Sequence, residues 1–172
     1  MKYALDGLAT FALAAAMTAI TTLSAVADGP VLVTSSEDSG EGTLRAALEE
    51  GSNSEGLTQI LIATDGDIEV KSTLDYAGKA PLAIHSKGQT VKTSVDTTLL
   101  SISQGADLTV TELNLAGPGK FNIENQGKTR MGIFVDVRND QTGTVSFNLD
   151  DVEITGFAGY GVLISDCDIV EN

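Results

Sequence analysis

The stretch DLTVTELNLAG at residues 107–117 decides the fold, because its apolar spacing returns at an offset of 39 in SFNLDDVEITG at residues 146–156. In both stretches apolar and polar residues alternate on either side of a polar pair, Thr111-Glu112 in the first and Asp150-Asp151 in the second. Alternation with period two marks a strand with one buried face, and the polar pair predicts a corner where the chain turns. Short strands and corners at a fixed period are typical of a β-solenoid, whose stacked coils share one aliphatic core.

A third copy, IEVKSTLDYAG at residues 68–78, extends the repeat towards the N-terminus. Leu74, Leu113 and Val152 follow one another at the same offset of 39, so these three residues are expected to stack at equivalent places. A competing all-β fold, the β-sandwich, does not require one spacing to recur. The repeat unit is either one coil with loops or nearly two short coils. The predicted fold class is all-β, a parallel β-helix over residues 58–172.

Residues 28–57 predict a strand followed by a short helix ahead of the repeats. Thr43 is the expected N-cap and Gly51 the expected left-handed stop. Arg45 is expected to pair with Glu49 one turn on. One face of the helix is apolar, formed by Leu44, Ala47 and Leu48. Because the first coil of a solenoid exposes apolar core and an unpaired strand edge, we expect this helix to cap it.

This N-terminal region resembles exported bacterial right-handed parallel β-helix repeat proteins, of both the surface or autotransporter-like and the polysaccharide-lyase-like kinds. The resemblance rests on a strand at 31–34, a turn DSGEG at 38–42, a helix GTLRAAL at 42–48 and a strand at 59–63. It is similar to the "SLREA" leader of surface proteins, although no Cys stands beside this helix. The resemblance spans residues 31–166 and implies a right-handed β-helix. It implies no single activity, because this fold carries adhesins, lyases, hydrolases and epimerases.

Residues 1–27 predict an export signal. Lys2 supplies a short positive start, an apolar and small-residue stretch follows, and Ala25-Val26-Ala27 gives the small-x-small cleavage pattern. The alternative is a single membrane anchor, since the apolar stretch is long enough to span a bilayer. We expect cleavage, no membrane insertion afterwards, and a secreted, periplasmic or cell-surface location in a bacterium.

The last residues predict an incomplete solenoid. Ile169–Asn172 stops at a coil with no visible cap, which indicates the N-terminal fragment of a longer protein, with capping by a partner chain as the alternative. Cys167 is the sole cysteine. Either its disulfide partner lies beyond Asn172 or it is an unpaired small hydrophobe, and both interpretations remain open.

The formal net charge of −14 excludes some partners. Nucleic acid needs a basic protein face, so no nucleic-acid binding is expected. Anionic lipid surfaces and acidic polysaccharides are disfavoured for the same reason unless a cation intervenes. High solubility is the simplest consequence of such a charge.

No catalytic and no cofactor-binding residue is assigned. His85 is the single histidine and is expected to point outward from its strand. Many acids are expected on outward faces, namely Asp136, Asp140, Asp150, Asp151, Glu153, Asp166 and Asp168. Two such carboxylates on neighbouring coils could serve as a glycosidase acid/base pair or hold Ca²⁺. The metal candidates are Asp150, Asp151, Asp166 and Asp168, with Ca²⁺ as the one metal left open, although a solvated acidic face is the favoured interpretation.

Two functions follow from these patterns. The first is a secreted or cell-surface β-helix scaffold, adhesin-like, that binds polysaccharide or cell-surface components and has no catalytic site of its own. The alternative is the N-terminal portion of a carbohydrate-active β-helix enzyme, a lyase, hydrolase or epimerase, acting on acidic polysaccharide. The sequence favours a chain that is not an enzyme by itself, and it leaves the oligomeric state open.

Overall fold

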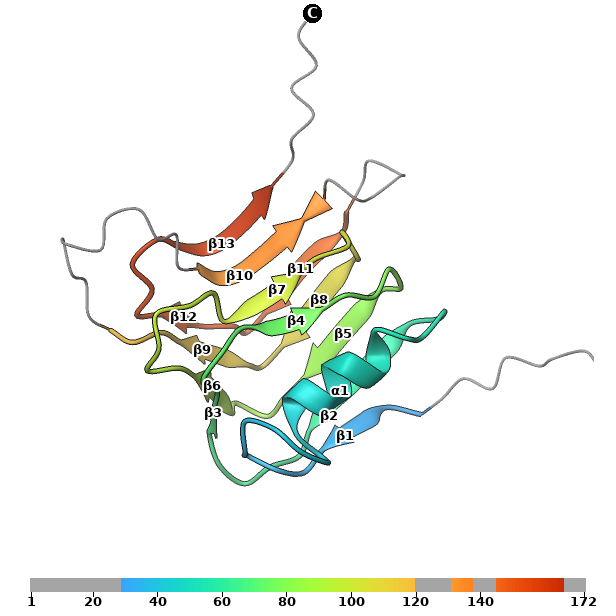
Figure 1. The fold of residues 1–172 in the computed structure, drawn as a ribbon, viewed down its shortest axis with the longest axis horizontal. Helices are drawn as coiled ribbons and strands as arrows, with labels where there is room; N and C mark the ends of the chain where they lie inside the picture. Colours follow the sequence, from blue (N-terminus) through green and yellow to red (C-terminus); the bar gives the residue numbers. More distant parts are fainter. Residues whose placement is uncertain (1–28, 120–130, 138–144, 166–172) are drawn as a thin grey trace, which may run out of the picture.

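The computed structural model describes residues 29–119, 131–137 and 145–165, and in these the chain is almost entirely β-structure with one helix (Figure 1). The strands form three open sheets, and every strand pairing is parallel. A β-sandwich consists of antiparallel sheets, so the competing fold is excluded. The arrangement is compatible with the expected parallel solenoid.

The strands are assigned to sheets A, B and C in their order along each sheet. Sheet A contains β1 (Val31–Val33), β2 (Thr58–Ile62), β5 (Leu82–His85), β8 (Leu108–Thr111) and β11 (Phe147–Asp150). Sheet B contains β3 (Ile68–Glu69), β6 (Thr90–Lys92), β9 (Asn114–Ala116) and β12 (Ile154–Thr155). Sheet C contains β4 (Leu74–Tyr76), β7 (Leu100–Ile102), β10 (Met131–Asp136) and β13 (Tyr160–Ser165).

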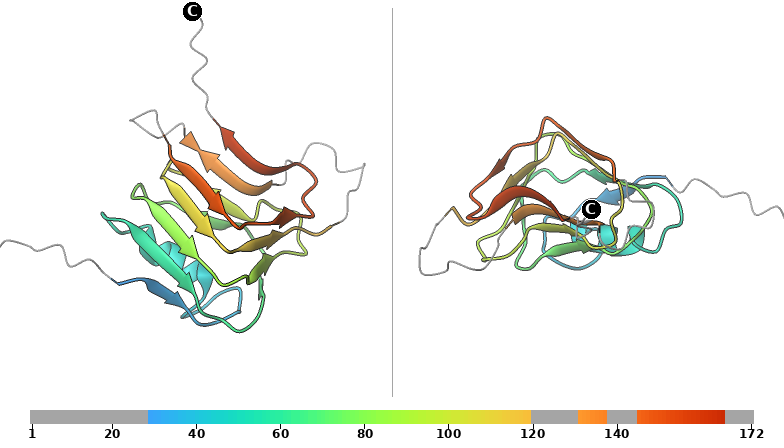
Figure 2. Two further views of the ribbon diagram at one scale, coloured as in Figure 1. Left: turned by 180° about the vertical axis from the view of Figure 1, so that it is seen from behind. Right: turned by 90° about the horizontal axis from the view of Figure 1, so that it is seen from above.

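From β2 onward the chain visits sheets A, B and C in turn, and each such circuit is named a coil. Coil 1 is β2–β3–β4, coil 2 is β5–β6–β7, coil 3 is β8–β9–β10 and coil 4 is β11–β12–β13. Viewed from above, the three sheets surround a common interior (Figure 2). Inward residues of successive coils stack in columns such as Ile60, Ile84 and Val110, each at most 1% exposed. The core is therefore mainly aliphatic, as the sequence predicted, with Tyr76 as its buried aromatic residue.

The spacing of 39 is confirmed between coils 3 and 4. Leu108 pairs with Phe147 in sheet A and Leu115 pairs with Ile154 in sheet B, both at this offset. The chain from β8 to β11 also includes residues 120–130 and 138–144, which lie outside the described ranges. Between β8 and β11 the described strands visit each of the three sheets once, so the repeat unit is one coil and not two short coils.

The repeat copy at residues 68–78 does not lie at the place that the spacing of 39 predicts. Leu74 pairs with Leu100 in sheet C, whereas Leu113 stands at the corner between sheets A and B, so the predicted stack of Leu74 with Leu113 and Val152 is wrong. The reason is that coils differ in the number of residues: Ile60 pairs with Ile84 at an offset of only 24, against 39 between Leu108 and Phe147. An offset of 39 then moves a residue from one sheet to another.

Helix α1 (Leu44–Gly51) forms where the sequence predicted it. Thr43 is extended and its hydroxyl accepts the backbone N–H of Ala46 at 3.3 Å, which satisfies a helix donor that has no partner within the helix. The predicted apolar face is buried, with Leu44, Ala47 and Leu48 at most 3% exposed. The helix packs against β1, β2 and β4, and in Figure 1 it lies beside β4 at the N-terminal end of sheet C.

Two predicted details of this helix are wrong. Gly51 is the last helical residue and has no left-handed φ, and the helix ends at Ser52 in a right-handed conformation. Glycine is needed at 51 for space instead, because a Cβ there would overlap the methyl group of Thr58. Arg45 pairs with Asp38 and not with Glu49, since the turn before the helix brings that carboxylate closer.

Candidate functional site

We name the outward-facing surface of the five-stranded sheet A the sheet A face. Side chains that point outward from its strands form two rows across the coils. One row is Leu32, Leu61, His85, Thr111 and Asp150, and the other is Gln59, Ala83, Thr109 and Asn148. Neighbours within a row stand about 4.8 Å apart, the spacing of paired strands. The left view of Figure 2 shows this sheet from outside, with α1 on the far side of it.

The sheet A face carries little charge although the whole chain carries −14. Its six outward residues on β2, β5 and β8 have no formal charge with His85 neutral, and Asp150 brings the first acid at β11. Four of the six are hydrogen-bonding side chains: Gln59, His85, Thr109 and Thr111. Gln59 is exposed and the other three are half-buried. The face is therefore polar, uncharged in its centre and accessible.

His85 lies as predicted. It follows the buried Ile84, stacks between Leu61 and Thr111 on the sheet A face, and is half-buried. An imidazole can donate and accept a hydrogen bond at once, which suits a binding surface. Neither stacked neighbour carries a carboxylate that would orient the imidazole as a general base.

The corner between sheets A and B repeats an uncommon backbone conformation. Gly88, Glu112 and Asp151 have φ of 85°, 53° and 51° in coils 2, 3 and 4. The corner is tied between coils, since the N–H of Gly88 donates to the carbonyl of Glu112 at 2.7 Å and that of Glu112 donates to the carbonyl of Asp150 at 2.9 Å. Glu112 and Asp151 therefore hold exposed carboxylates at equivalent positions of adjacent coils.

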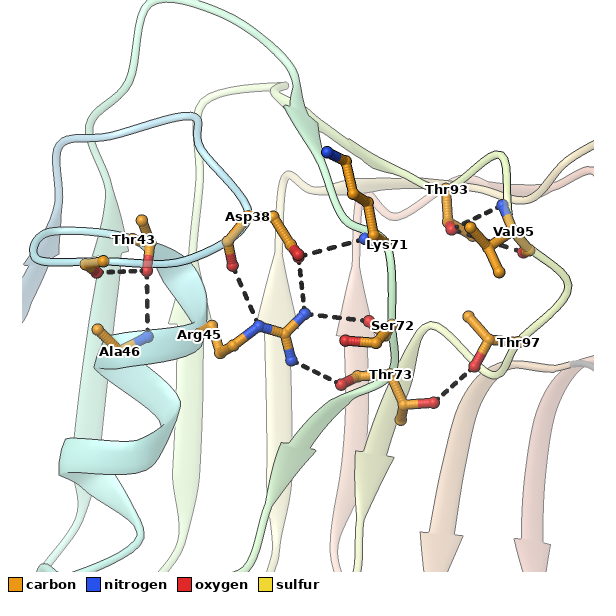
Figure 3. Close-up of polar contacts among 11 residues, drawn as sticks. Asp38, Thr43, Arg45, Ala46, Lys71, Ser72, Thr73, Thr93, Val95 and Thr97 are labelled. Carbon is orange, nitrogen blue, oxygen red and sulfur yellow. Dashed lines mark hydrogen bonds and ion pairs between the residues drawn. The ribbon is translucent and has the colours of Figure 1, made fainter.

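A cleft of about 390 Å³ lies between α1 and the start of sheet C. Its lining residues are Arg45, Glu49, Ser52, Asn53, Thr73, Asp75 and Ala77. The guanidinium of Arg45 donates to the carboxylate and carbonyl of Asp38 at 2.7 and 3.1 Å and to the carbonyls of Ser72 and Thr73 at 3.1 and 2.8 Å (Figure 3). Most of its donors are thus engaged, so Arg45 joins the helix to the β3–β4 turn and is not a free ligand for substrate.

Two ionisable groups near α1 have shifted pKa values. The hydrogen bond from Arg45 holds the pKa of Asp38 below its ordinary 3.8, assisted by the backbone N–H of Lys71. Burial raises the pKa of the Tyr76 phenol above 10.0. This phenol donates to the carbonyl of Ala80 at 2.8 Å in the interior. Both groups are therefore parts of the scaffold.

The predicted acids have different outcomes. Asp150, Asp151 and Glu153 are exposed in coil 4, whereas Asp140, Asp166 and Asp168 lie outside the described residues, as does Cys167. Within residues 29–119, 131–137 and 145–165, no three His, Cys, Asp or Glu side chains come together in a metal-binding group. Asp136 follows the inward Val135 and lies on the outward side of β10, as predicted, but it is only 6% exposed and so is not part of a solvated acidic face.

The sheet A face was not singled out by sequence reasoning. The signal was present as uncharged polar residues at alternate positions of β2, β5 and β8, but only the register shows that they share one surface. Comparison with family models, with curated proteins and with solved structures finds no match. In the described ranges, no helix is long and apolar enough to cross a bilayer.

Proposed function

We propose that this chain is an exported, right-handed parallel β-helix scaffold that binds through the sheet A face, adhesin-like and without a catalytic site of its own. Right-handedness follows the strong general preference of connections between parallel strands. In this proposal α1 caps the first coil, since it buries its apolar face against β1, β2 and β4. The signal-like residues 1–27 support export to the bacterial surface or beyond it.

The observation that carries the proposal is the uncharged centre of the sheet A face in a strongly acidic chain. Hydrogen-bonding groups stand in rows at about 4.8 Å on a rigid sheet. A polymer with repeated hydroxyl groups can bond to several of them at once, and each bond adds a small increment. Acidic polymers would be repelled by the rest of the protein. The favoured ligand is therefore a neutral polysaccharide.

Affinity electrophoresis of the full chain through gels containing neutral or acidic polysaccharides tests this. We expect retardation by at least one neutral glycan and none by pectate or alginate. Thr109→Glu places a charge in the middle of the sheet A face and should weaken binding about tenfold, a loss of about 1.4 kcal/mol. Thr90→Glu adds the same charge at a half-buried outward position of sheet B and should leave binding unchanged.

Two outcomes would overturn the proposal. One is the absence of binding to every neutral glycan under conditions where the chain is folded by circular dichroism. The other is an equal loss of binding in Thr90→Glu and Thr109→Glu, because the effect would then come from net charge and not from the face.

The alternative function, part of a carbohydrate-active enzyme on acidic polysaccharide, has one supporting observation. Glu112 and Asp151 hold exposed carboxylates on adjacent coils, as an acid/base pair requires. The purified chain should then cleave pectate or alginate, and Glu112→Gln should abolish the cleavage. Without cleavage by the wild-type chain, Glu112 and Asp151 do not form an acid/base pair, and the alternative loses the observation that supports it.

A further inference from the structure

His85 is the one ionisable group among the outward residues that β2, β5 and β8 present on the sheet A face. It lies half-buried between Leu61 and Thr111, and it is the single histidine of the chain. Histidine is the side chain that ordinarily gains or loses its charge between about pH 5 and pH 8. The charge at the centre of the sheet A face therefore depends on one proton.

The polar side chains of the sheet A face are available to a ligand. In the ranges that the structure describes, its four hydrogen-bonding side chains, His85 among them, make no side-chain hydrogen bond within the protein. By contrast, the side-chain amide of Gln89, further along coil 2, donates to the carbonyl of Thr64 at 3.0 Å. The neutral ring of His85 can therefore bond to a ligand through both nitrogens, one as donor and the other as acceptor.

No carboxylate lies next to His85 within the described sheets. Its neighbours across the strands are Leu61 and Thr111, and the previous outward residue of β5 is Ala83. Asp150, the acid in the same row, lies two strands away, about 10 Å at the spacing of paired strands and beyond the Debye length at physiological salt. A charged ring at His85 has no carboxylate partner on this face.

Three other charged residues follow the strands of sheet A, at the corner towards sheet B. They are Asp65, Lys87 and Glu112, one in each of coils 1, 2 and 3, and all are exposed to solvent. In the described part of the chain none of them forms an ion pair with His85. Solvent and salt weaken interactions between such exposed charges, so these residues do not replace a direct partner.

A neutral glycan that covers His85 removes water from the ring. A neutral imidazole exchanges that water for one donated and one accepted hydrogen bond with sugar hydroxyl groups. An imidazolium has no acceptor, and covering it buries a positive charge that no carboxylate pairs with, which costs free energy. The neutral form of His85 is therefore the form that suits a neutral glycan.

We propose that the proton on His85 controls glycan binding by the sheet A face: the neutral imidazole admits a neutral polysaccharide and the imidazolium rejects it. This inference rests on the proposed glycan binding and adds its regulation, with binding near neutral pH and release in mildly acidic surroundings. In the bound form one sugar hydroxyl donates to the unprotonated ring nitrogen, and the ring N–H donates to a second sugar oxygen.

Affinity electrophoresis of the full chain at about pH 7.5 and about pH 5.5 tests the proposal, in gels that contain hydroxyethylcellulose, galactomannan or dextran as the neutral glycan. The glycan that retards the chain at the higher pH should bind about tenfold more weakly at the lower pH, because a histidine is mainly charged there and only the neutral form binds. Circular dichroism at both pH values checks that the chain is folded.

Two substitutions of His85 separate its charge from the rest of the protein. His85→Gln keeps a donor and an acceptor but does not titrate, so it should bind as the wild type does at the higher pH and equally well at the lower pH. His85→Lys carries a fixed positive charge and should bind about tenfold more weakly at both pH values. Thr90→Lys adds the same charge on sheet B and should behave as the wild type does.

The outcomes distinguish this inference from the proposed function. No retardation by any of the neutral glycans at either pH would overturn glycan binding and its control together. Equal retardation of the wild type at both pH values would overturn the control by His85 alone, and so would an equal loss in acid for His85→Gln and the wild type. A loss in Thr90→Lys as large as that in His85→Lys would also overturn it, because the effect would then come from net charge.

Discussion

The first and the last of the described coils differ in how their apolar residues are covered. At the N-terminal end α1 buries Leu44, Ala47 and Leu48 against the sheets, and Pro30 precedes the edge strand β1. At the C-terminal end of the described chain, the inward residues of coil 4 stay half-buried or exposed, and β11 has a free edge. The difference shows that an inward apolar side chain is buried only where a neighbouring coil or the helix lies over it.

The largest expected contrast comes from truncating one leucine at each end. Leu48→Ala leaves a cavity at a fully buried position of α1 and should lower the free energy of unfolding by about 3 kcal/mol, as large-to-small core changes do. Leu149→Ala removes the same group from a half-buried site in coil 4 and should cost about 1 kcal/mol, because less apolar surface is lost from the interior. Urea unfolding followed by circular dichroism measures both. Equal losses would mean that the two ends are packed alike.

Replacing one glycine in α1 and one in coil 4 should give a smaller difference in stability. Gly51→Ala forces a methyl group into Thr58 beneath the helix and should destabilise the chain by about 2 kcal/mol. Gly161→Ala in β13 meets only Ile154, whose Cγ2 atom would lie an ordinary 3.6 Å away, and should be close to neutral. Thermal unfolding of the two variants checks this. A stable Gly51→Ala variant would show that the helix can move off coil 1 without cost.

The smallest expected effect is the pH dependence of the stability that the Asp38–Arg45 ion pair contributes. Because the pKa of Asp38 is lowered in the folded chain, its ion pair with Arg45 stabilises above the unfolded pKa near 3.8 and is lost as pH falls through the folded pKa. Asp38→Asn should cost about 1 kcal/mol at neutral pH and progressively less as the pH falls from about 5 towards 3. Stability curves at several pH values measure this difference.

The matched control at the other end is Asp151→Asn, an exposed residue in a left-handed conformation that Asn also tolerates. It should change stability by no more than a few tenths of a kcal/mol. If the cost of Asp38→Asn did not depend on pH, the ion pair would not link the helix to the β3–β4 turn as described.

Much of the local structure could be predicted from the sequence. Alternating apolar residues predicted strands, Thr43 and its neighbours predicted a capped helix, and the stretch at 107–117 predicted its partner in the next coil. The position of Leu74 could not be predicted, because connections of unequal length break a fixed period without changing the strands. Nor could the sheet A face be foreseen, since its members come from strands that are far apart along the chain and at unequal offsets.

The sequence by itself determined the period-two alternation, the aliphatic core, the helix with its N-cap and the negative charge, because these depend on composition or on residues close along the chain. Only the tertiary structure decided the register between coils, the partner of Arg45 and the exposure of Tyr160 and Ile164. These properties depend on which segment lies over which. That is settled by stacking and by the lengths of the connections, because strands with similar apolar patterns could pair in several registers.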